Sequence, residues 1–149
     1  MKNRNLGVVW LTAAVALAGS LALAHDAGEE TTTPLQRQKL PDVPGKQVVM
    51  VIVNYAPGQA SLPHRHAGSV FAYVLEGEVV SQLEGQPPIT YQAGQSWYET
   101  PRVPHLVSKN ASATKPARLI AWLLMDDGGQ VKEPLPKPVS KVPAATPLI

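Results

Sequence analysis

The sequence predicts a single all-β domain, built as a sandwich or a barrel. Short runs of β-branched and aromatic residues recur along the chain, and turn-forming residues separate them about every 8–12 positions. The 15 prolines and 11 glycines suit many short turns better than long helices. A length of 149 residues is enough for one compact domain with its own core. With 44% hydrophobic and 16% charged residues, the chain is neither disordered throughout nor a multi-span membrane protein.

Residues 1–24 have the features of a secretory signal peptide. Lys2 and Arg4 give a basic start, an apolar run follows from Leu6, and the tripeptide ALA at 22–24 fits the small-x-small cleavage pattern. The alternative is an uncleaved N-terminal anchor, because the apolar run is almost long enough to span a bilayer. Either way we expect a periplasmic or secreted protein, and no stable membrane span once the signal is cleaved.

The charge and the cysteine count exclude several classes of partner and site. The whole chain has a formal net charge of +2, and cleavage after residue 24 leaves 11 Lys and Arg against 11 Asp and Glu. The basic residues form no stripe, so nucleic acid is not an expected partner. The chain has no cysteine. Disulfides and thiolate ligands are therefore excluded, and any metal must be held by nitrogen and oxygen atoms.

The N-terminal half of the mature chain begins with a polar segment and continues with hydrophobic strands. Residues 25–44 are polar with scattered prolines, and predict a mobile arm that docks near residues 35–40. Residues 47–57 are β-branched and almost continuously apolar, which predicts a buried strand ended by a Pro-Gly turn. Residues 69–85 predict two strands around a turn at Glu76-Gly77.

The second half predicts four more strands and a tail. Residues 89–101 read as two short strands around an Ala-Gly turn, and residues 103–112 as a further strand. Residues 117–125 form the last strong strand, because they lack the polar face that a helix of this length would show. Residues 128–149 include five prolines among the last 17 positions, which cannot join a central sheet. We expect an extended or disordered tail there.

The histidines are the most informative polar residues. His64 and His66 are spaced i, i+2, which places both side chains on one face of an extended segment. Neutral imidazole is a good ligand for Fe, Mn, Zn, Ni or Cu. Two ligands make a weak site, so a third must come from elsewhere in the fold. An HxH pair alone more often marks two solvent-exposed loop histidines than a metal site.

Around this pair the sequence resembles the cupin family. The first cupin motif runs Gly, five residues, HxH, three or four residues, Glu, six residues, Gly. Gly58, His64, His66 and Gly77 match it in register. The Glu position falls at Val70, which cannot bind a metal, so the usual carboxylate ligand is missing from its place.

A second cupin motif is matched loosely, by Gly94, the Pro101–Pro104 region, His105 and Asn110. The resemblance implies a single-domain double-stranded β-helix, that is, a jelly-roll barrel of two antiparallel sheets. It assigns residues 45–127 to the cupin domain, between the arm and the tail.

The resemblance also implies that the two motif histidines and His105 converge on one divalent transition metal. Without the motif Glu, the site either keeps three histidines and water, or another side chain compensates. Glu99 is the candidate, because it lies six residues before His105 in an otherwise apolar stretch, where an unpaired buried charge is costly. The alternative is that Glu99 faces solvent or pairs with Arg65 or Arg102.

Aromatic residues are available to wall a pocket beside the metal, with ordinary core packing as the alternative for each. They are Phe71, Tyr73, Trp97, Tyr98 and Trp122.

Two classes of function fit this site. The first is a metal-dependent enzyme acting on a small organic molecule: an oxygenase that takes O₂ and a chelating substrate at Fe(II), or an isomerase or lyase in which the metal is a Lewis acid. Cupin oxygenases that attack diketones, thiols or flavonoids resemble this arrangement. The second is a non-catalytic periplasmic module that holds a metal or small ligand. The retained histidines count against a third, an empty structural relic. Pairing through edge strands makes a homodimer the expected assembly by resemblance.

Overall fold

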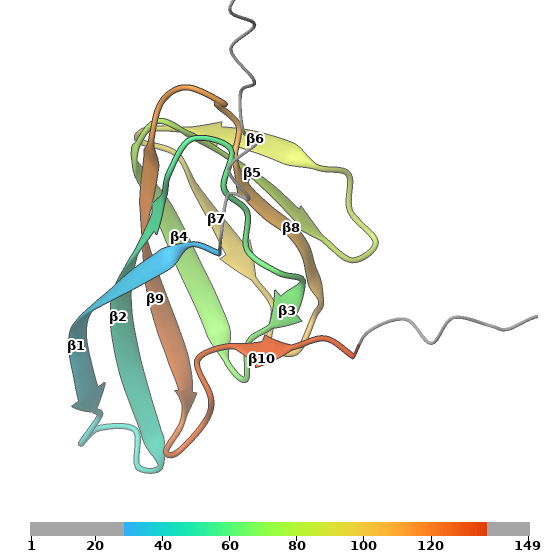
Figure 1. Ribbon diagram of the computed structural model, residues 1–149. Helices are drawn as coiled ribbons and strands as arrows, with labels where there is room; N and C mark the ends of the chain where they lie inside the picture. The colour runs from blue at the N-terminus through green and yellow to red at the C-terminus, as the bar shows by residue number, and fades with distance from the viewer. Residues whose placement is uncertain (1–28, 137–149) are drawn as a thin grey trace, which may run out of the picture.

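The structure, a computed structural model, describes residues 29–136, and every regular element in that range is a β-strand. The strands are β1 (Thr31–Lys39), β2 (Lys46–Tyr55), β3 (His64–Arg65), β4 (Ser69–Glu76), β5 (Glu78–Leu83), β6 (Ile89–Gln92), β7 (Ser96–Glu99), β8 (His105–Asn110), β9 (Ala117–Asp126) and β10 (Glu133–Pro134). They form two antiparallel five-stranded sheets, ordered β1-β2-β9-β4-β7 and β10-β3-β8-β5-β6 (Figure 1). The predicted all-β fold is confirmed.

The core lies between the two sheets and is lined mainly by the first. Along β4, Val70, Ala72 and Val74 are buried, while the residues between them face outward. This alternation follows from the two-residue period of a strand. The long pair β2–β9 runs in register from Lys46↔Asp126 to Tyr55↔Ala117 and forms the back of the barrel. The strands predicted in residues 47–57, 69–85, 89–101, 103–112 and 117–125 are all present.

The turn between β4 and β5 shows why the first motif ends in glycine. Gly77 has φ of +73°, a conformation that side-chain-bearing residues rarely adopt. A Cβ atom placed there would lie 2.6 Å from the carbonyl oxygen of Pro116. Both the backbone angle and the close approach therefore require glycine at this position.

The two segments that flank the barrel differ from the expected arm and tail. Thr31–Lys39 forms a full strand on the edge of β2, and all nine of its residues are exposed. A strand with solvent on both faces has no hydrophobic alternation, which is why its sequence reads as a polar arm. Its Pro34 lies beside a β-bulge, where an edge strand tolerates proline. In the expected tail, β10 pairs with β3, so Pro134 also takes an edge position.

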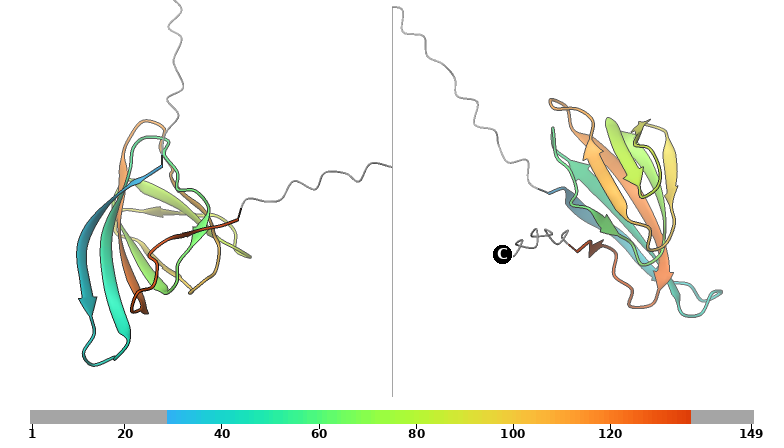
Figure 2. Two further views of the ribbon diagram at one scale, coloured as in Figure 1. Left: turned by 60° about the horizontal axis from the view of Figure 1, so that its bottom comes forward. Right: turned by 90° about the vertical axis from the view of Figure 1, so that its right-hand side faces the viewer.

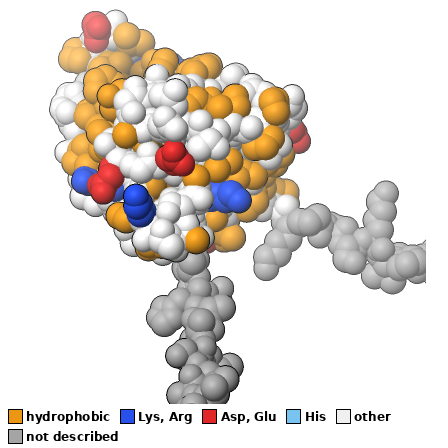
Figure 3. Space-filling model, turned by 90° about the horizontal axis from the view of Figure 1, so that it is seen from above, with side chains coloured by type: hydrophobic (Ala, Val, Ile, Leu, Met, Phe, Trp, Pro, Cys, Tyr) orange, Lys and Arg blue, Asp and Glu red, His pale blue; other side chains and the backbone are white. Residues whose placement is uncertain are grey.

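The turned views in Figure 2 show β1 and β2 side by side at one end of the molecule, and β10 crossing on the side of β3. On the face that Figure 3 shows, Lys and Arg side chains are scattered among hydrophobic and uncharged ones and do not gather into a stripe. Within residues 29–136, the structure contains no helix that is long and apolar enough to cross a membrane. The signal peptide predicted at residues 1–24 lies outside the described residues.

Candidate metal centre

The three predicted histidines lie together at one end of the barrel interior. His64 opens β3, His66 follows that strand directly, and His105 opens β8. Because β3 and β8 pair with His64 opposite His105, residues about 40 positions apart become neighbours in one sheet. One ring nitrogen from each histidine lies within 4.8 Å of the others, and the rings of His64 and His105 are buried. The three rings thus lie around one centre, as the sequence predicts, and their role as metal ligands stays a prediction.

Backbone carbonyl groups fix the orientation of His64 and His66. Nδ1 of His64 donates to the carbonyl oxygen of Leu62 at 2.7 Å, and Nδ1 of His66 donates to that of Val131. A carbonyl oxygen can only accept, so the proton of each ring is on Nδ1. The two Nε2 atoms then face each other at 3.2 Å. Carbonyl partners of this kind orient metal-ligating histidines and raise their basicity.

Burial keeps the imidazole of His64 uncharged. It lowers the pKa of the His64 imidazole to about 4, so the ring is neutral at neutral pH and its Nε2 lone pair is free. A neutral imidazole is the form that binds a metal.

Glu99 completes the cluster from the end of β7. Its side chain is buried, with only 4% of the residue's surface exposed. Oε1 accepts a hydrogen bond of 2.9 Å from the indole of Trp97, and Oε2 lies 3.2 Å from Nδ1 of His105 and 3.4 Å from Nε2 of His66. Glu99 therefore does not face solvent, and Arg65 instead pairs with Glu133 on the surface.

The carboxyl group of Glu99 is a carboxylate. Burial by itself raises its pKa, but the imidazole of His105 and the other polar neighbours outweigh that effect and lower the pKa below its usual value. The other nitrogen of His105, Nε2, lies 2.8 Å from the hydroxyl of Ser81. The lowered pKa of Glu99 describes the state in which Nδ1 of His105 carries a proton toward Glu99. In the other tautomer Nε2 donates to the Ser81 hydroxyl, and Nδ1 presents a lone pair toward Glu99.

In that second tautomer the cluster gathers electron-pair donors with no proton donor to match them. Oε2 of Glu99 and Nδ1 of His105 are buried and make no hydrogen bond within residues 29–136. The facing Nε2 atoms of His64 and His66 add two more acceptors. Such an arrangement is stable only with a cation at its centre, either bound protons or a metal. Three nitrogen donors and one carboxylate oxygen are a ligand set that suits divalent Fe, Mn, Zn, Ni or Cu. The residues present thus fit a metal.

Residues 51–123 match the family model of the cupin domain. The chain belongs to the cupin family. No curated protein matches the sequence at a significant level.

Solved structures show the same double-stranded β-helix fold. A conserved protein from Klebsiella pneumoniae with this domain is 19% identical, with a TM-score of 0.56 over 71% of this chain and 86% of the other. An RmlC-like cupin from Methanocaldococcus jannaschii is 18% identical, with a TM-score of 0.54 over 68% and 84% of the two chains. The DMSP lyase DddQ from Ruegeria pomeroyi is 18% identical, with a TM-score of 0.59 over 78% of this chain. This chain spans only 56% of that lyase. These identities support the fold alone.

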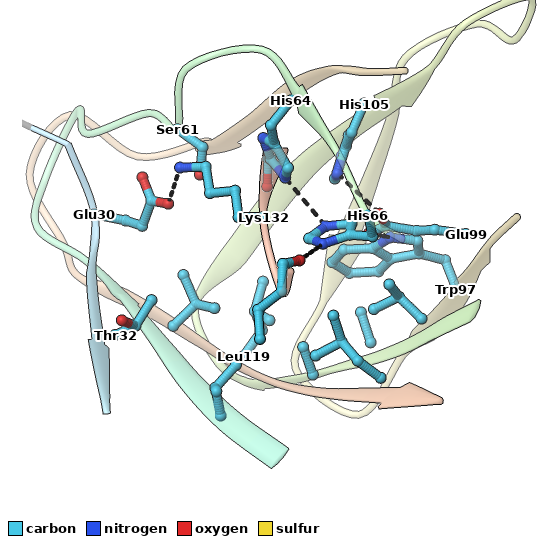
Figure 4. Close-up of a pocket in the computed structure, with 18 of the residues that line it drawn as sticks. Glu30, Thr32, Ser61, His64, His66, Trp97, Glu99, His105, Leu119 and Lys132 are labelled. Atoms are coloured by element: carbon cyan, nitrogen blue, oxygen red, sulfur yellow. Dashed lines mark hydrogen bonds and ion pairs between the residues drawn. The ribbon is translucent and has the colours of Figure 1, made fainter. Parts of the chain in front are cut away.

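The cupin barrel encloses a cavity of about 270 Å³ beside the metal centre (Figure 4). Most of its wall is aliphatic: Val51, Val53, Val70, Ala72, Leu119, Ala121, Leu123 and Val131. Its polar lining outside the cluster is Glu30, Thr32, Tyr55, Ser61, Ser108 and Lys132. A space of this size accommodates a small organic molecule beside the histidine cluster and little more.

The prediction of an aromatic wall is correct for Trp97 alone. Trp97 lines the cavity and donates to Glu99, whereas Phe71, Tyr73, Tyr98 and Trp122 lie on the outer face of the sheet. Each of the four is about half exposed. In each case strand alternation turns the aromatic ring outward because a neighbour in sequence, such as Ala72 or Ala121, faces the core.

Sequence reasoning missed the polar residues that flank the cluster. Ser81 on β5 and the Val131 carbonyl hold two of the rings, and Glu30 and Lys132 line the cavity. No cupin motif marks these positions. Each lies far along the chain from the ring or partner that it contacts, so only the folded barrel brings them together.

Proposed function

We propose that this cupin binds one divalent transition metal through His64, His66, His105 and Glu99 and acts as an oxygenase on a small organic molecule. The observation that supports the proposal is the gathering of three ring nitrogens within 4.8 Å of one another, with Oε2 of Glu99 within 3.4 Å of the rings of His66 and His105. When bound, the metal supplies a Lewis-acid centre with coordination positions left for substrate and O₂.

The residues of the chain have distinct roles in this proposal. The three imidazoles and Glu99 hold the cation, and the negative charge of Glu99 offsets part of the metal's charge. The Val131 carbonyl keeps the proton of His66 on Nδ1, and the Ser81 hydroxyl orients the ring of His105. The aliphatic wall excludes water from the cavity and packs against the apolar part of a substrate.

On the side of Glu99 and Trp97, the cavity offers no free general base among the described residues, which favours oxygenase over isomerase or lyase chemistry. Its titratable groups outside the cluster, within the described residues, are Glu30, Tyr55 and Lys132. Glu30 and Lys132 pair with each other. Burial raises the pKa of Tyr55 to about 12, so its hydroxyl stays protonated, bonded to Ser61 and Ser108. Chemistry in this cavity would therefore be carried by the metal rather than by a side-chain base.

The gathering of the three histidines also fits one alternative, a non-catalytic module that holds a metal or a small ligand. Oxygen uptake separates the two. Protein purified without chelators and loaded with Fe(II) is supplied with a panel of diketones, phenols and thiols in an oxygen electrode. The oxygenase proposal predicts O₂ consumption with at least one class, abolished in His66→Ala. Full metal occupancy with no O₂ consumption across the panel would support the binding module.

The proposal places the protein outside the cytoplasm, in the periplasm or secreted. It rests on the basic start, the apolar run and the ALA tripeptide within residues 1–24. Sequencing the N-terminus of the mature protein should find His25 first, and a mature protein that keeps residues 1–24 would contradict cleavage. The homodimer stays a prediction that analytical ultracentrifugation would test.

A further inference from the structure

A partly buried ion pair forms a second polar site in the cavity beside the histidine cluster. Nζ of Lys132 lies 2.6 Å from Oε1 of Glu30. Both residues line the cavity, and Figure 4 shows them at one side of it, with Glu99 and Trp97 at the other. Glu30 directly precedes β1, and Lys132 precedes β10, so the two residues come from opposite ends of the described chain.

The ion pair leaves hydrogen-bonding capacity unused. Only 6% of the Glu30 side chain is exposed, and 32% of the Lys132 side chain. Oε2 of Glu30 is buried and accepts no hydrogen bond from the described part of the chain. An ammonium group carries three donors, and Glu30 takes one of those of Lys132. A buried carboxylate oxygen without a partner costs free energy that a bound ligand can recover.

The ion pair is not part of the matched cupin domain. Both residues lie outside residues 51–123, the part that matches the cupin domain. A buried ion pair is often no more stable than hydrophobic residues of similar volume in its place. Its presence against a cavity wall that is otherwise mostly aliphatic therefore points to recognition rather than to packing.

We propose that Glu30 and Lys132 form a subsite for an uncharged hydroxyl group at the end of the substrate remote from the metal. The hydroxyl donates to Oε2 of Glu30 and accepts from Nζ of Lys132, which satisfies both. A carboxylate would meet the carboxylate of Glu30, and an ammonium group would meet Lys132, so neither charged end fits. This inference rests on the proposed function, because the metal holds the other end of the substrate.

The cavity also limits the size of that substrate. Its volume of about 270 Å³ corresponds to roughly nine water-sized groups at about 30 Å³ each. The wall between the two polar sites is aliphatic, with Val53, Leu119 and Val131 among its residues. The substrate class is therefore a short aliphatic molecule with a metal-binding head and a terminal hydroxyl.

Alkyl hydroxamates of matched length test this subsite without any turnover. The protein is loaded with Co(II), whose visible spectrum changes when the hydroxamate head binds, and metal analysis first establishes the stoichiometry. Chains of three to six carbons ending in methyl, hydroxyl or carboxylate are titrated. At the best length we expect the hydroxyl-ended probe to bind about fivefold tighter than the methyl-ended one, the effect of about one net hydrogen bond. The carboxylate-ended probe should bind weakest.

Removing both charges together avoids leaving one of them unpaired. The double variant E30M/K132M should lose the hydroxyl preference and keep the affinity for the methyl-ended probe. The control K39Q/D127N, which removes an exposed ion pair outside the cavity, should keep the preference. If the wild-type protein binds metal but shows no hydroxyl preference, or if the preference survives in E30M/K132M, the proposed subsite is wrong and the proposed metal site is unaffected. Absence of metal from the wild-type protein would overturn the proposed function, and this inference with it.

Discussion

Val70 on β4 and Glu99 on β7 are directly opposite each other in the first sheet. Val70 occupies the position at which the first cupin motif carries glutamate, and Glu99 supplies a buried carboxylate to the same cluster. Side chains directly opposite on antiparallel strands lie about 4.5–5.5 Å apart on one face. A carboxylate missing from the motif position is therefore present on the neighbouring strand, and that it replaces the motif glutamate as a metal ligand stays a prediction.

Substitution of Glu99 should weaken metal binding. Glu99→Gln keeps the size and the Trp97 hydrogen bond but removes the charge, so we expect at least a tenfold loss of affinity for Zn(II) or Fe(II), on the scale of losing about 1.4 kcal/mol. Competition with a chromophoric chelator measures the change. The double variant V70E/E99V, which moves the carboxylate across the strand pair, should recover part of the affinity. Equal affinities of E99Q and wild type would mean that Glu99 is not a ligand.

Each histidine of the cluster should be necessary, whereas the residue between two of them should not. His66→Ala removes a ligand, so metal stoichiometry should fall from about one per chain toward zero. Arg65→Ala is the matched control, because Arg65 lies between the two ligands but pairs on the surface with Glu133. Elemental analysis of protein purified without chelators measures both. A full complement of metal in H66A would refute the assigned site.

The segment after β9 should contribute to metal affinity although it lies outside the matched cupin domain. A chain that stops after Gln130 loses the Val131 carbonyl that orients His66, whereas one that stops after Pro136 keeps it. Loss of such an orienting partner typically lowers metal affinity about 10- to 100-fold. We expect that loss only for the shorter chain. K132M keeps the carbonyl and removes the ion pair, so it separates the two effects. Equal affinity of both truncated chains would show that the carbonyl has no such role.

The metal-free protein should lose stability as the pH falls. The pKa of His64 is about 4 in the folded protein and 6.5 in the unfolded chain, so the unfolded chain binds a proton first. Stability is then fully present above about pH 6.5 and falls by about 3 kcal/mol as the pH drops to about 4. The lowered pKa of Glu99 acts in the same direction at the acidic end. Urea unfolding at pH 7.5, 6 and 5 measures the slope, which should be shallower in His64→Leu. An identical slope in that variant would contradict the assignment.

The sequence predicts the strands and the histidine cluster well because both follow local rules. Alternation and turn residues mark β2 through β9, and the HxH spacing places two rings on one face. Glu99 was detectable because a carboxylate stands out in an apolar stretch. The prediction of an aromatic wall failed because strand periodicity does not tell which face of a strand points inward. In β4 and β9 both faces carry hydrophobic residues. The Glu30–Lys132 pair joins residues 102 positions apart, and no local pattern announces it.

The central claim is that one metal ion lies at the meeting point of His64, His66, His105 and Glu99. Anomalous diffraction from a crystal of the metal-loaded protein, collected at the absorption edge of the metal, tests it most directly. We expect one strong peak per chain, about 2.0–2.3 Å from Nε2 of His64 and His66, Nδ1 of His105 and Oε2 of Glu99. A fully loaded crystal whose anomalous peak lies elsewhere, or a cluster that stays without one, would contradict it.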